Sequence, residues 1–132
     1  MLPPLRSLAV LAAAAVVACG APAPAPAARH LVLGEPDAGR VITVHRGDTV
    51  ELVLFEPRDA SGSWNRWTAA SSAPSVVRLT STDRHGPSSG SYYFADFTAE
   101  HSGSARLTAS QSTACAAGRP ACGPLTFPVV VR

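Results

Sequence analysis

The sequence predicts an all-β domain, an immunoglobulin-like β-sandwich of six to eight short strands, and three observations lead to this fold class. Short runs rich in Val, Ile, Thr and aromatic residues alternate between apolar and polar side chains from Leu31 onward. Clusters of Gly, Ser and Pro, which favour turns, separate these runs. Twelve prolines and ten glycines among 132 residues disfavour long helices beyond the N-terminal segment.

Residues 1–18 are predicted to be an export signal that is not part of the fold. Arg6 supplies a positive charge ahead of the apolar run from Leu8 to Val17, and small residues follow. The closing tetrad Val16-Val17-Ala18-Cys19 resembles the lipobox of bacterial lipoproteins, which implies that Cys19 becomes the first mature residue and carries a diacylglycerol anchor. The alternative is an ordinary signal cleaved after Ala18 or near Ala21, which leaves Cys19 as a free thiol.

Residues 19–29 are predicted to be a tether between the anchor and the domain. The Ala-Pro repeat after Gly20 cannot form a packed core and favours an extended, polyproline-like chain. Such a chain would hold the domain on the order of 30 Å from the lipid surface. Binding of the repeat in an aromatic groove is the alternative use. We therefore expect a protein of the bacterial cell envelope, extracytoplasmic and attached to the membrane by its lipid anchor only.

The domain proper, residues 30–132, contains six segments with a strand pattern. They are Val41–His45, Thr49–Leu54, Val76–Thr80, Tyr92–Thr98, Ala105–Ala109 and Leu125–Val131. The first two are separated by Arg46-Gly47-Asp48, which suits a hairpin or a tight corner. In the second, Val50, Leu52 and Leu54 share one face, so that face is expected in the core. Pro128 cannot donate a hydrogen bond to a ladder, so it predicts an edge position or a bulge.

Cys115 and Cys122 are predicted to form a disulfide. An exported chain folds in an oxidising compartment, where such a bond persists. In the chain-entropy treatment a ring of this size stabilises the fold by about 2.5 kcal/mol. Zinc is the competing use of paired cysteines, but the spacing is not Cys-x-x-Cys and no second pair of ligands follows. Neither a metal nor a cofactor is expected.

Composition and motif context argue against several function classes. The +2 net charge, with no Lys in the chain, is too weak for nucleic acid to be expected as a partner. The histidines lack the spacing of a metal site or of a Ser-His pair. The run from Gly86 to Gly90 fits Gly-x-Ser-x-Gly, but a nucleophile elbow precedes a helix, and strand-like residues follow here. The four histidines that lack this spacing are His30, His45, His85 and His101. From these observations together, we do not expect an enzyme.

The order of motifs from Val41 to Arg132 carries a family resemblance. It consists of the Ile-x-Val-x-x-Gly-Asp-x-Val-x-Leu-x-Leu run that begins at Ile42, a loop that ends at Trp67, the aromatic strand Tyr92–Phe97 and a Val-rich C-terminus. This order is similar to that of chagasin-type inhibitors of papain-like cysteine proteases. The resemblance implies a reversible, non-covalent inhibitor whose three loops at one end of the sandwich enter the protease cleft.

The resemblance assigns binding roles to three segments. The first stands where the family has Asn-Pro-Thr-Thr-Gly-Tyr-x-Trp and keeps a Gly and the closing Trp, the second is Gly-rich, and the third keeps Arg-Pro but has Ala121 in place of a Trp. The candidate binding residues are Asp59, Ala60, Ser61, Gly62, Ser63, Trp64 and Trp67 in the first segment, His85, Gly86, Ser88, Ser89 and Gly90 in the second, and Arg119 and Pro120 in the third.

Two points remain open in this interpretation. Trp67 is expected in the core, because a Trp between two sheets is common in this architecture, whereas Trp64 suits either the core or an exposed contact. The departure of the first segment from the family motif supports an alternative function. This is a non-inhibitory immunoglobulin-like module that uses the same loops to bind another cell-envelope protein or polymer. Inhibition of papain distinguishes the two hypotheses.

Overall fold

The computed structural model describes residues 27–57, 66–87, 90–111 and 123–132. Within these ranges the chain forms eight strands and one turn of 3-10 helix, η1 (Glu35–Asp37). The strands are β1 (His30–Leu33), β2 (Ile42–Val44), β3 (Thr49–Pro57), β4 (Trp67–Ser71), β5 (Val77–His85), β6 (Gly90–Ala99), β7 (Gly103–Gln111) and β8 (Leu125–Val131). The predicted export signal, Cys19 and the Ala-Pro repeat up to residue 26 lie outside the described residues. In the described ranges no helix has the length and hydropathy needed to cross a membrane.

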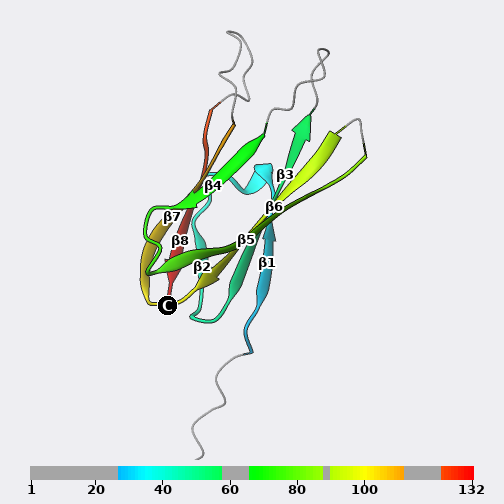
Figure 1. Ribbon diagram of the computed structural model, residues 1–132. Helices are drawn as coiled ribbons and strands as arrows, with labels where there is room; N and C mark the ends of the chain where they lie inside the picture. The colour runs from blue at the N-terminus through cyan, green and yellow to red at the C-terminus, as the bar shows by residue number, and fades with distance from the viewer. Residues whose placement is uncertain (1–26, 58–65, 88–89, 112–122) are drawn as a thin grey trace, which may run out of the picture.

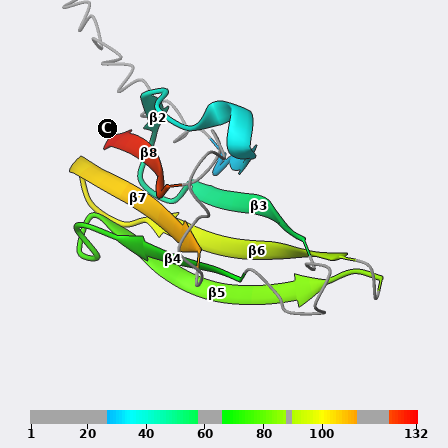
Figure 2. The ribbon, with the colours of Figure 1, turned by 90° about the horizontal axis from the view of Figure 1, so that it is seen from above.

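The strands form two four-stranded sheets that face each other (Figures 1 and 2). Sheet A has the order β1-β3-β6-β5 and sheet B the order β2-β8-β7-β4. The pairs β1–β3 and β2–β8 are parallel, and the other neighbouring pairs are antiparallel. The predicted all-β sandwich is confirmed.

The core lies between the sheets and follows the alternation seen in the sequence. Val50, Leu52 and Leu54 of β3 are fully buried, as their shared face predicts. Sheet B contributes Phe127 and Leu107, which are also fully buried. Each large apolar side chain removed from water in this way stabilises the fold by roughly 1.5–3 kcal/mol.

The Arg46-Gly47-Asp48 connection is a corner between the sheets, one of the two possibilities that its sequence left open. β2 belongs to sheet B and β3 to sheet A, so the two strands do not form a hairpin. Gly47 has a φ of 92°, a conformation that favours glycine. Asp48 is buried, and its carboxylate accepts 2.8 Å hydrogen bonds from the main-chain N–H groups of His45 and Arg29.

The last residue of the predicted tether is bonded to this corner. The main-chain oxygen of Arg29 accepts a 2.9 Å bond from Thr49 N, and the Arg29 guanidinium lies 3.4 Å from the Asp48 carboxylate. Burial by itself raises the pKa of Asp48, but the bonds from Arg29 and His45 outweigh it and leave that pKa below its usual value. The chain therefore enters the domain at a fixed point.

Pro128 lies at a locally unpaired edge position, one of the two places that the sequence predicted. β8 is an interior strand of sheet B, but its pairing with β7 continues through Arg106↔Pro128 without a register shift, so there is no bulge. The main chain of Arg106 is hydrogen-bonded to Ser72 on its other side. Pairing with β2 begins only at Ile42↔Val129. The missing N–H of Pro128 therefore removes no ladder bond.

The outer face of sheet A carries a pair of carboxyl groups at its centre. Glu51 of β3 stands opposite Asp96 of β6, and the Nε2 atom of His30 lies 3.7 Å from Glu51 Oε1. Asp96 Oδ2 accepts a bond from Ser81, whereas Oδ1 is buried and has no hydrogen-bond donor among the described residues. Burial and the neighbouring Asp96 raise the pKa of Glu51, and they outweigh the opposing influence of His30.

Candidate functional site

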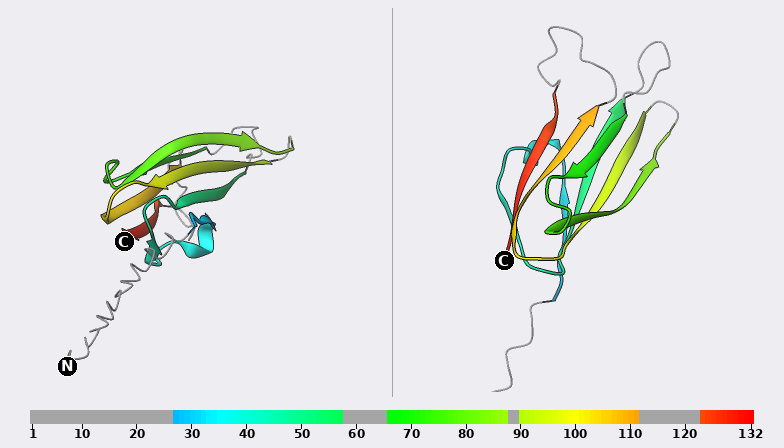
Figure 3. Two further views of the ribbon diagram at one scale, coloured as in Figure 1. Left: turned by 90° about the horizontal axis from the view of Figure 1, so that it is seen from below. Right: turned by 60° about the vertical axis from the view of Figure 1, so that its left-hand side comes forward.

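Six strand ends meet at one end of the sandwich, which we call the loop end. It comprises the C-terminal ends of β3, β5 and β7 and the N-terminal ends of β4, β6 and β8. The register brings them together through Pro57↔Gly90 in sheet A and Trp67↔Gln111 in sheet B. Figure 1 and the right-hand view of Figure 3 show these ends on the side opposite to the point where the chain enters β1. The three segments that the resemblance singled out are therefore the connections at the loop end.

Most of the candidate binding residues lie outside the described residues. The ones affected are Asp59, Ala60, Ser61, Gly62, Ser63, Trp64, Ser88, Ser89, Arg119 and Pro120, together with the predicted disulfide partners Cys115 and Cys122. The structure places four candidates, namely Trp67, His85, Gly86 and Gly90. The site can accordingly be built from the strand ends that carry the three connections.

Trp67 is the first residue of β4 and ties the two sheets together. It is only 3% exposed, so its predicted place in the core is confirmed. Its main-chain N–H donates a 2.7 Å bond to Glu56 Oε2, and its indole N–H donates a 2.8 Å bond to the main-chain oxygen of Phe55. Both acceptors belong to the last residues of β3. The two ends of the β3–β4 connection are thus bonded to each other across the sandwich.

Glu56 is a fully buried carboxylate that gathers donors from three other strands. Its Oε1 atom accepts a 2.9 Å bond from Arg84 Nε of β5 and a 3.4 Å contact from Ser91 Oγ of β6. Arg84 also donates a 2.7 Å bond from Nη2 to the main-chain oxygen of Trp67. We call this arrangement the Glu56–Arg84 clamp: Glu56, Arg84, Ser91 and the main chain of Trp67. A buried charge is tolerated here because it is paired and multiply hydrogen-bonded.

Side chains of sheet A also cover the free edge of β4. β4 is an edge strand of sheet B, and the peptide groups of Trp67 and Ala69 point away from β7. Ala69 N donates a 3.2 Å bond to the hydroxyl of Tyr93, whose ring lies 4.7 Å from the guanidinium carbon of Arg84. The edge is therefore capped by polar side chains, and another strand cannot pair there without displacing them.

The β5–β6 connection is short and is bordered by a histidine and two glycines. His85 is the last residue of β5 and is exposed, with its ring 5.5 Å from that of Phe94 and its Nε2 2.7 Å from Asp83 Oδ2. Gly90, the first residue of β6, is buried against the ring of Phe55. At Gly86 a Cβ atom would lie 2.6 Å from the main-chain oxygen of Gly90. Close main-chain packing at this turn therefore requires glycine.

An exposed aromatic surface adjoins the loop end on the outer face of sheet A. Phe55 and Tyr92 form a cross-strand pair with ring centroids 5.4 Å apart, and they are 44% and 47% exposed. The next pair towards the centre of the sheet is Val53 and Phe94, both partly buried. Phe55 lies two residues before the end of β3. This surface can contact a partner that approaches the loop end from the side of sheet A.

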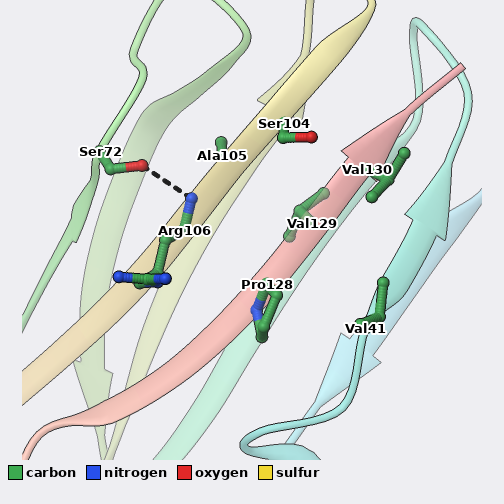
Figure 4. A pocket seen from close by; sticks show the side chains of 8 residues that line it. All are labelled: Val41, Ser72, Ser104, Ala105, Arg106, Pro128, Val129 and Val130. Carbon is green, nitrogen blue, oxygen red and sulfur yellow. Dashed lines mark hydrogen bonds between the residues drawn. The ribbon is translucent and has the colours of Figure 1, made fainter.

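A separate shallow groove of about 440 Å³ lies on the outer face of sheet B and includes none of the strand ends of the loop end (Figure 4). Val41, Pro128 and Val130 line one part of it, together with the buried residues Ala105 and Val129. Ser72, Ser104 and Arg106 line the other part, where Ser72 Oγ accepts a 2.8 Å bond from Arg106 N. Arg106 is its single charged lining residue, and the groove contains no acid–base pair.

The described part of the chain shows a surface suited to binding. It contains no group of three or more His, Cys, Asp and Glu side chains that could hold a metal ion. Two polar side chains close to the loop end, Glu56 and Arg84, are committed to each other and to the main chain. What the loop end offers is a rigid base for three connections with an aromatic surface beside it.

Sequence reasoning missed Glu56, Arg84 and Phe55 as parts of this site. One signal was available for Glu56: it continues the buried series Val50, Leu52, Leu54 at the next alternate position, and a carboxylate at a core position needs a partner. The sequence offered no comparable signal for Arg84. Arg84 lies in the second half of β5, where the residues on both faces of the strand are polar and exposed.

The fold of the described residues, with eight strands in two sheets and three chain connections at one end, is chagasin-like, as two solved structures show. The resemblance seen in the sequence therefore holds for the fold. No protein-family profile matches the sequence, and no curated protein matches it.

Two solved structures are similar to this chain. The crystal structure of the cysteine protease inhibitor EhICP2 from Entamoeba histolytica aligns with a TM-score of 0.63 and 16% identity, covering 82% of this chain and 100% of that one. The solution structure of amebosin aligns with a TM-score of 0.52 and 19% identity, covering 78% of this chain and 98% of that one. At these identities the likeness establishes the fold.

Proposed function

We propose that this domain is a reversible, non-covalent inhibitor of papain-like cysteine proteases that acts through the three connections at the loop end. The observation that carries the proposal is the structural match over the whole length of a solved cysteine protease inhibitor. The inter-sheet bonds of Trp67 supply rigid strand ends beneath the first connection. Rigid loops bind with a smaller loss of conformational entropy than loops that must be ordered.

The position of the chain entry supports an attached inhibitor. The hydrogen bonds of Arg29 to the Asp48 corner hold the start of the described chain at the end opposite to the loop end (Figure 1). If Cys19 is lipidated in a bacterial envelope, the anchored part of the chain joins the domain at the end opposite to the loop end, which leaves the strand ends there accessible to an incoming protease. Cys19 lipidation is tested by metabolic labelling with an alkyne fatty acid. Label is expected on the wild-type chain and not on Cys19→Ala, and equal label on both would contradict it.

Inhibition is tested by titrating papain with the full-length chain purified in detergent. We expect competitive inhibition that is reversed by dilution, with no cleavage of the chain. Trypsin is the control, because an inhibitor that occupies a cysteine protease cleft should not affect it. Papain assays require a thiol, so the predicted Cys115–Cys122 disulfide is examined with a Cys115→Ser/Cys122→Ser variant and not by reduction. No inhibition at 10 µM chain, roughly the weak end of a specific interaction, would exclude the proposal.

The exposed pair Phe55 and Tyr92 favours a second candidate function, a non-inhibitory module that binds another cell-envelope protein or polymer. Exposed aromatic side chains supply large contact area at protein interfaces. Loss of envelope binding in a Phe55→Ser/Tyr92→Ser variant, together with no effect on papain in the wild type, would support this candidate over the inhibitor.

A further inference from the structure

We propose that Glu56 and Arg84 are positioning residues that hold the ends of β3, β4, β5 and β6, from which the β3–β4 and β5–β6 connections start, in the arrangement needed for target binding. The inference rests on the proposed function, because it gives these two side chains a part in the affinity for the protease. Glu56 is fully buried and cannot touch a partner itself. Any effect on binding must therefore pass through the strands that its carboxylate joins.

The Glu56–Arg84 clamp contains one group from each of the four strands that border these two connections. Glu56 comes from β3, the main chain of Trp67 from β4, Arg84 from β5 and Ser91 from β6. Of these four strands, β3, β5 and β6 belong to sheet A, and only β4 belongs to sheet B. The sheet ladders therefore do not fix β4 relative to β5, and the clamp does.

Every group of the clamp lies within two residues of a connection. Glu56 is the next-to-last residue of β3, Trp67 the first of β4 and Arg84 the next-to-last of β5. A displacement at these points is passed directly to the attached segments. When several groups must contact a rigid partner at the same time, a small displacement of one of them lowers the binding affinity strongly.

The hydrogen bonds of the Glu56–Arg84 clamp fix the relative orientation of the groups that they join, which an apolar contact would not do. The guanidinium of Arg84 reaches Glu56 Oε1 through Nε and Trp67 O through Nη2, so one planar group fixes two acceptors relative to each other. The ring of Tyr93 lies against the same guanidinium at 4.7 Å. An ion pair with a buried partner often contributes little net stability compared with apolar replacements, so we assign this half-buried pair a positioning role.

The decisive variant is Arg84→Lys in the full-length chain. Lysine keeps the positive charge, and with a side chain that is 34% exposed in the wild type it can be accommodated, but an ammonium cannot serve both acceptors in the fork geometry. We expect the inhibition constant for papain to rise about tenfold at a temperature where the variant is fully folded. The amide hydrogen of Trp67 should exchange faster with solvent, as measured by nuclear magnetic resonance.

Arg78→Lys is the matched control. Arg78 lies on the same strand and pairs with Glu100 through an Nε–Oε1 bond of 2.7 Å, but both residues lie at the other end of the sandwich. We expect it to leave the inhibition constant unchanged. A second variant, Glu56→Leu/Arg84→Met, replaces the clamp with apolar volume and should weaken inhibition at least as much as Arg84→Lys.

The outcomes separate the two proposals. If the wild type does not inhibit papain, the proposed function fails and this role of the clamp fails with it. If the wild type inhibits and folded Arg84→Lys inhibits equally well, the proposed function stands and the positioning role is overturned. It is likewise overturned if Arg78→Lys weakens inhibition to the same degree, or if exchange of the Trp67 amide is unchanged.

Discussion

The indole N–H of Trp67 donates a 2.8 Å hydrogen bond to the main-chain oxygen of Phe55, so a core side chain of sheet B is tied to the backbone of sheet A. Tryptophan is suited to this position because it fills a large volume between the sheets and carries one donor at its edge. The same bond joins the two sides of the β3–β4 connection, with Phe55 near the end of β3 and Trp67 at the start of β4. Core packing and the geometry of the loop end therefore depend on one side chain.

Trp67→Phe tests this dual role. Phenylalanine fills most of the space but leaves the partly buried oxygen of Phe55 without its donor, so we expect the free energy of unfolding to fall by roughly 1–3 kcal/mol. Urea denaturation followed by circular dichroism measures it. Tyr92→Phe is the control, since its ring is 47% exposed, and it should change stability by less than about 0.5 kcal/mol. A loss below that limit in Trp67→Phe would contradict the role assigned to the bond.

The sandwich could be predicted because most of its strands alternate strictly. Leu125–Val131 was expected with the bounds that β8 has, and the predicted core face of β3 is the observed one. A half-buried strand has a period of two in its own sequence, so it needs no knowledge of its partners to be recognised. Local pattern was therefore sufficient for these elements.

β4 was not predicted, and the reason is that little in Trp67–Ser71 favours a strand. Apart from the Trp, this segment has small residues, and it becomes a strand through pairing with β7 and through bonds to Glu56 and Tyr93. The second half of β5 lacks an apolar face for a similar reason. Long-range partners decide both elements, and a single sequence does not show which residues will meet.

The candidate site was predictable as a place but not as a set of contacts. The three connections at one end follow from the family resemblance and the strand order. The pairing of Glu56 with Arg84 joins residues 28 positions apart on strands that are not neighbours in sheet A. Spacing in the sequence gives no rule for such a pair, although the core position of Glu56 indicates that it needs one.

Asp48→Asn is expected to destabilise the domain at neutral pH and to lose this effect in acid. The folded state holds the pKa of Asp48 below its usual value of 3.8, so its carboxylate contributes stability above that value, which is lost as the pH falls through the folded pKa. Asparagine keeps one acceptor for the N–H groups of Arg29 and His45 but loses the charge.

We expect Asp48→Asn to cost roughly 1–3 kcal/mol at pH 7, which is the usual worth of hydrogen bonds to a charged group. Urea denaturation at pH 7 and at pH 3 measures the difference, which should shrink at the lower pH. Asp83→Asn, which removes an exposed carboxylate of the same kind, is the control. A penalty of the same size at both pH values would show that the carboxylate charge is not the cause.

Glu51→Gln is expected to stabilise the domain at neutral pH, whereas Asp48→Asn destabilises it. The folded state raises the pKa of Glu51, so ionisation of this group opposes folding above pH 4.5 and not below it. Glutamine removes the charge and supplies N–H donors directly opposite Asp96, whose Oδ1 is buried without a donor among the described residues. We expect a gain of roughly 0.5–1 kcal/mol at pH 7 that disappears at pH 3.5. Urea denaturation at the two pH values measures the change in stability. The same gain at both, or a loss at pH 7, would contradict this account.

Gly86→Ala and Gly90→Ala should differ although the two glycines border the same connection. At Gly86 a Cβ atom would lie 2.6 Å from the Gly90 oxygen and from Ser91 Cα, which are main-chain atoms that cannot move without disturbing the start of β6. At Gly90 it would lie 2.7 Å from the ring of Phe55, which is 44% exposed and can rotate away.

We therefore expect Gly86→Ala to cost roughly 1–3 kcal/mol, as overpacking typically does, and Gly90→Ala to cost less than about 1 kcal/mol. Gly34→Ala, where the nearest atoms are 3.5 Å and 3.8 Å from the added carbon, is the control for alanine itself. Because Gly86 begins the β5–β6 connection, its substitution should also weaken papain inhibition more than that of Gly90. A larger loss of stability for Gly90→Ala than for Gly86→Ala, in thermal or urea denaturation, would contradict this prediction. It would show that the main chain beside Gly86 moves easily to accept the added carbon.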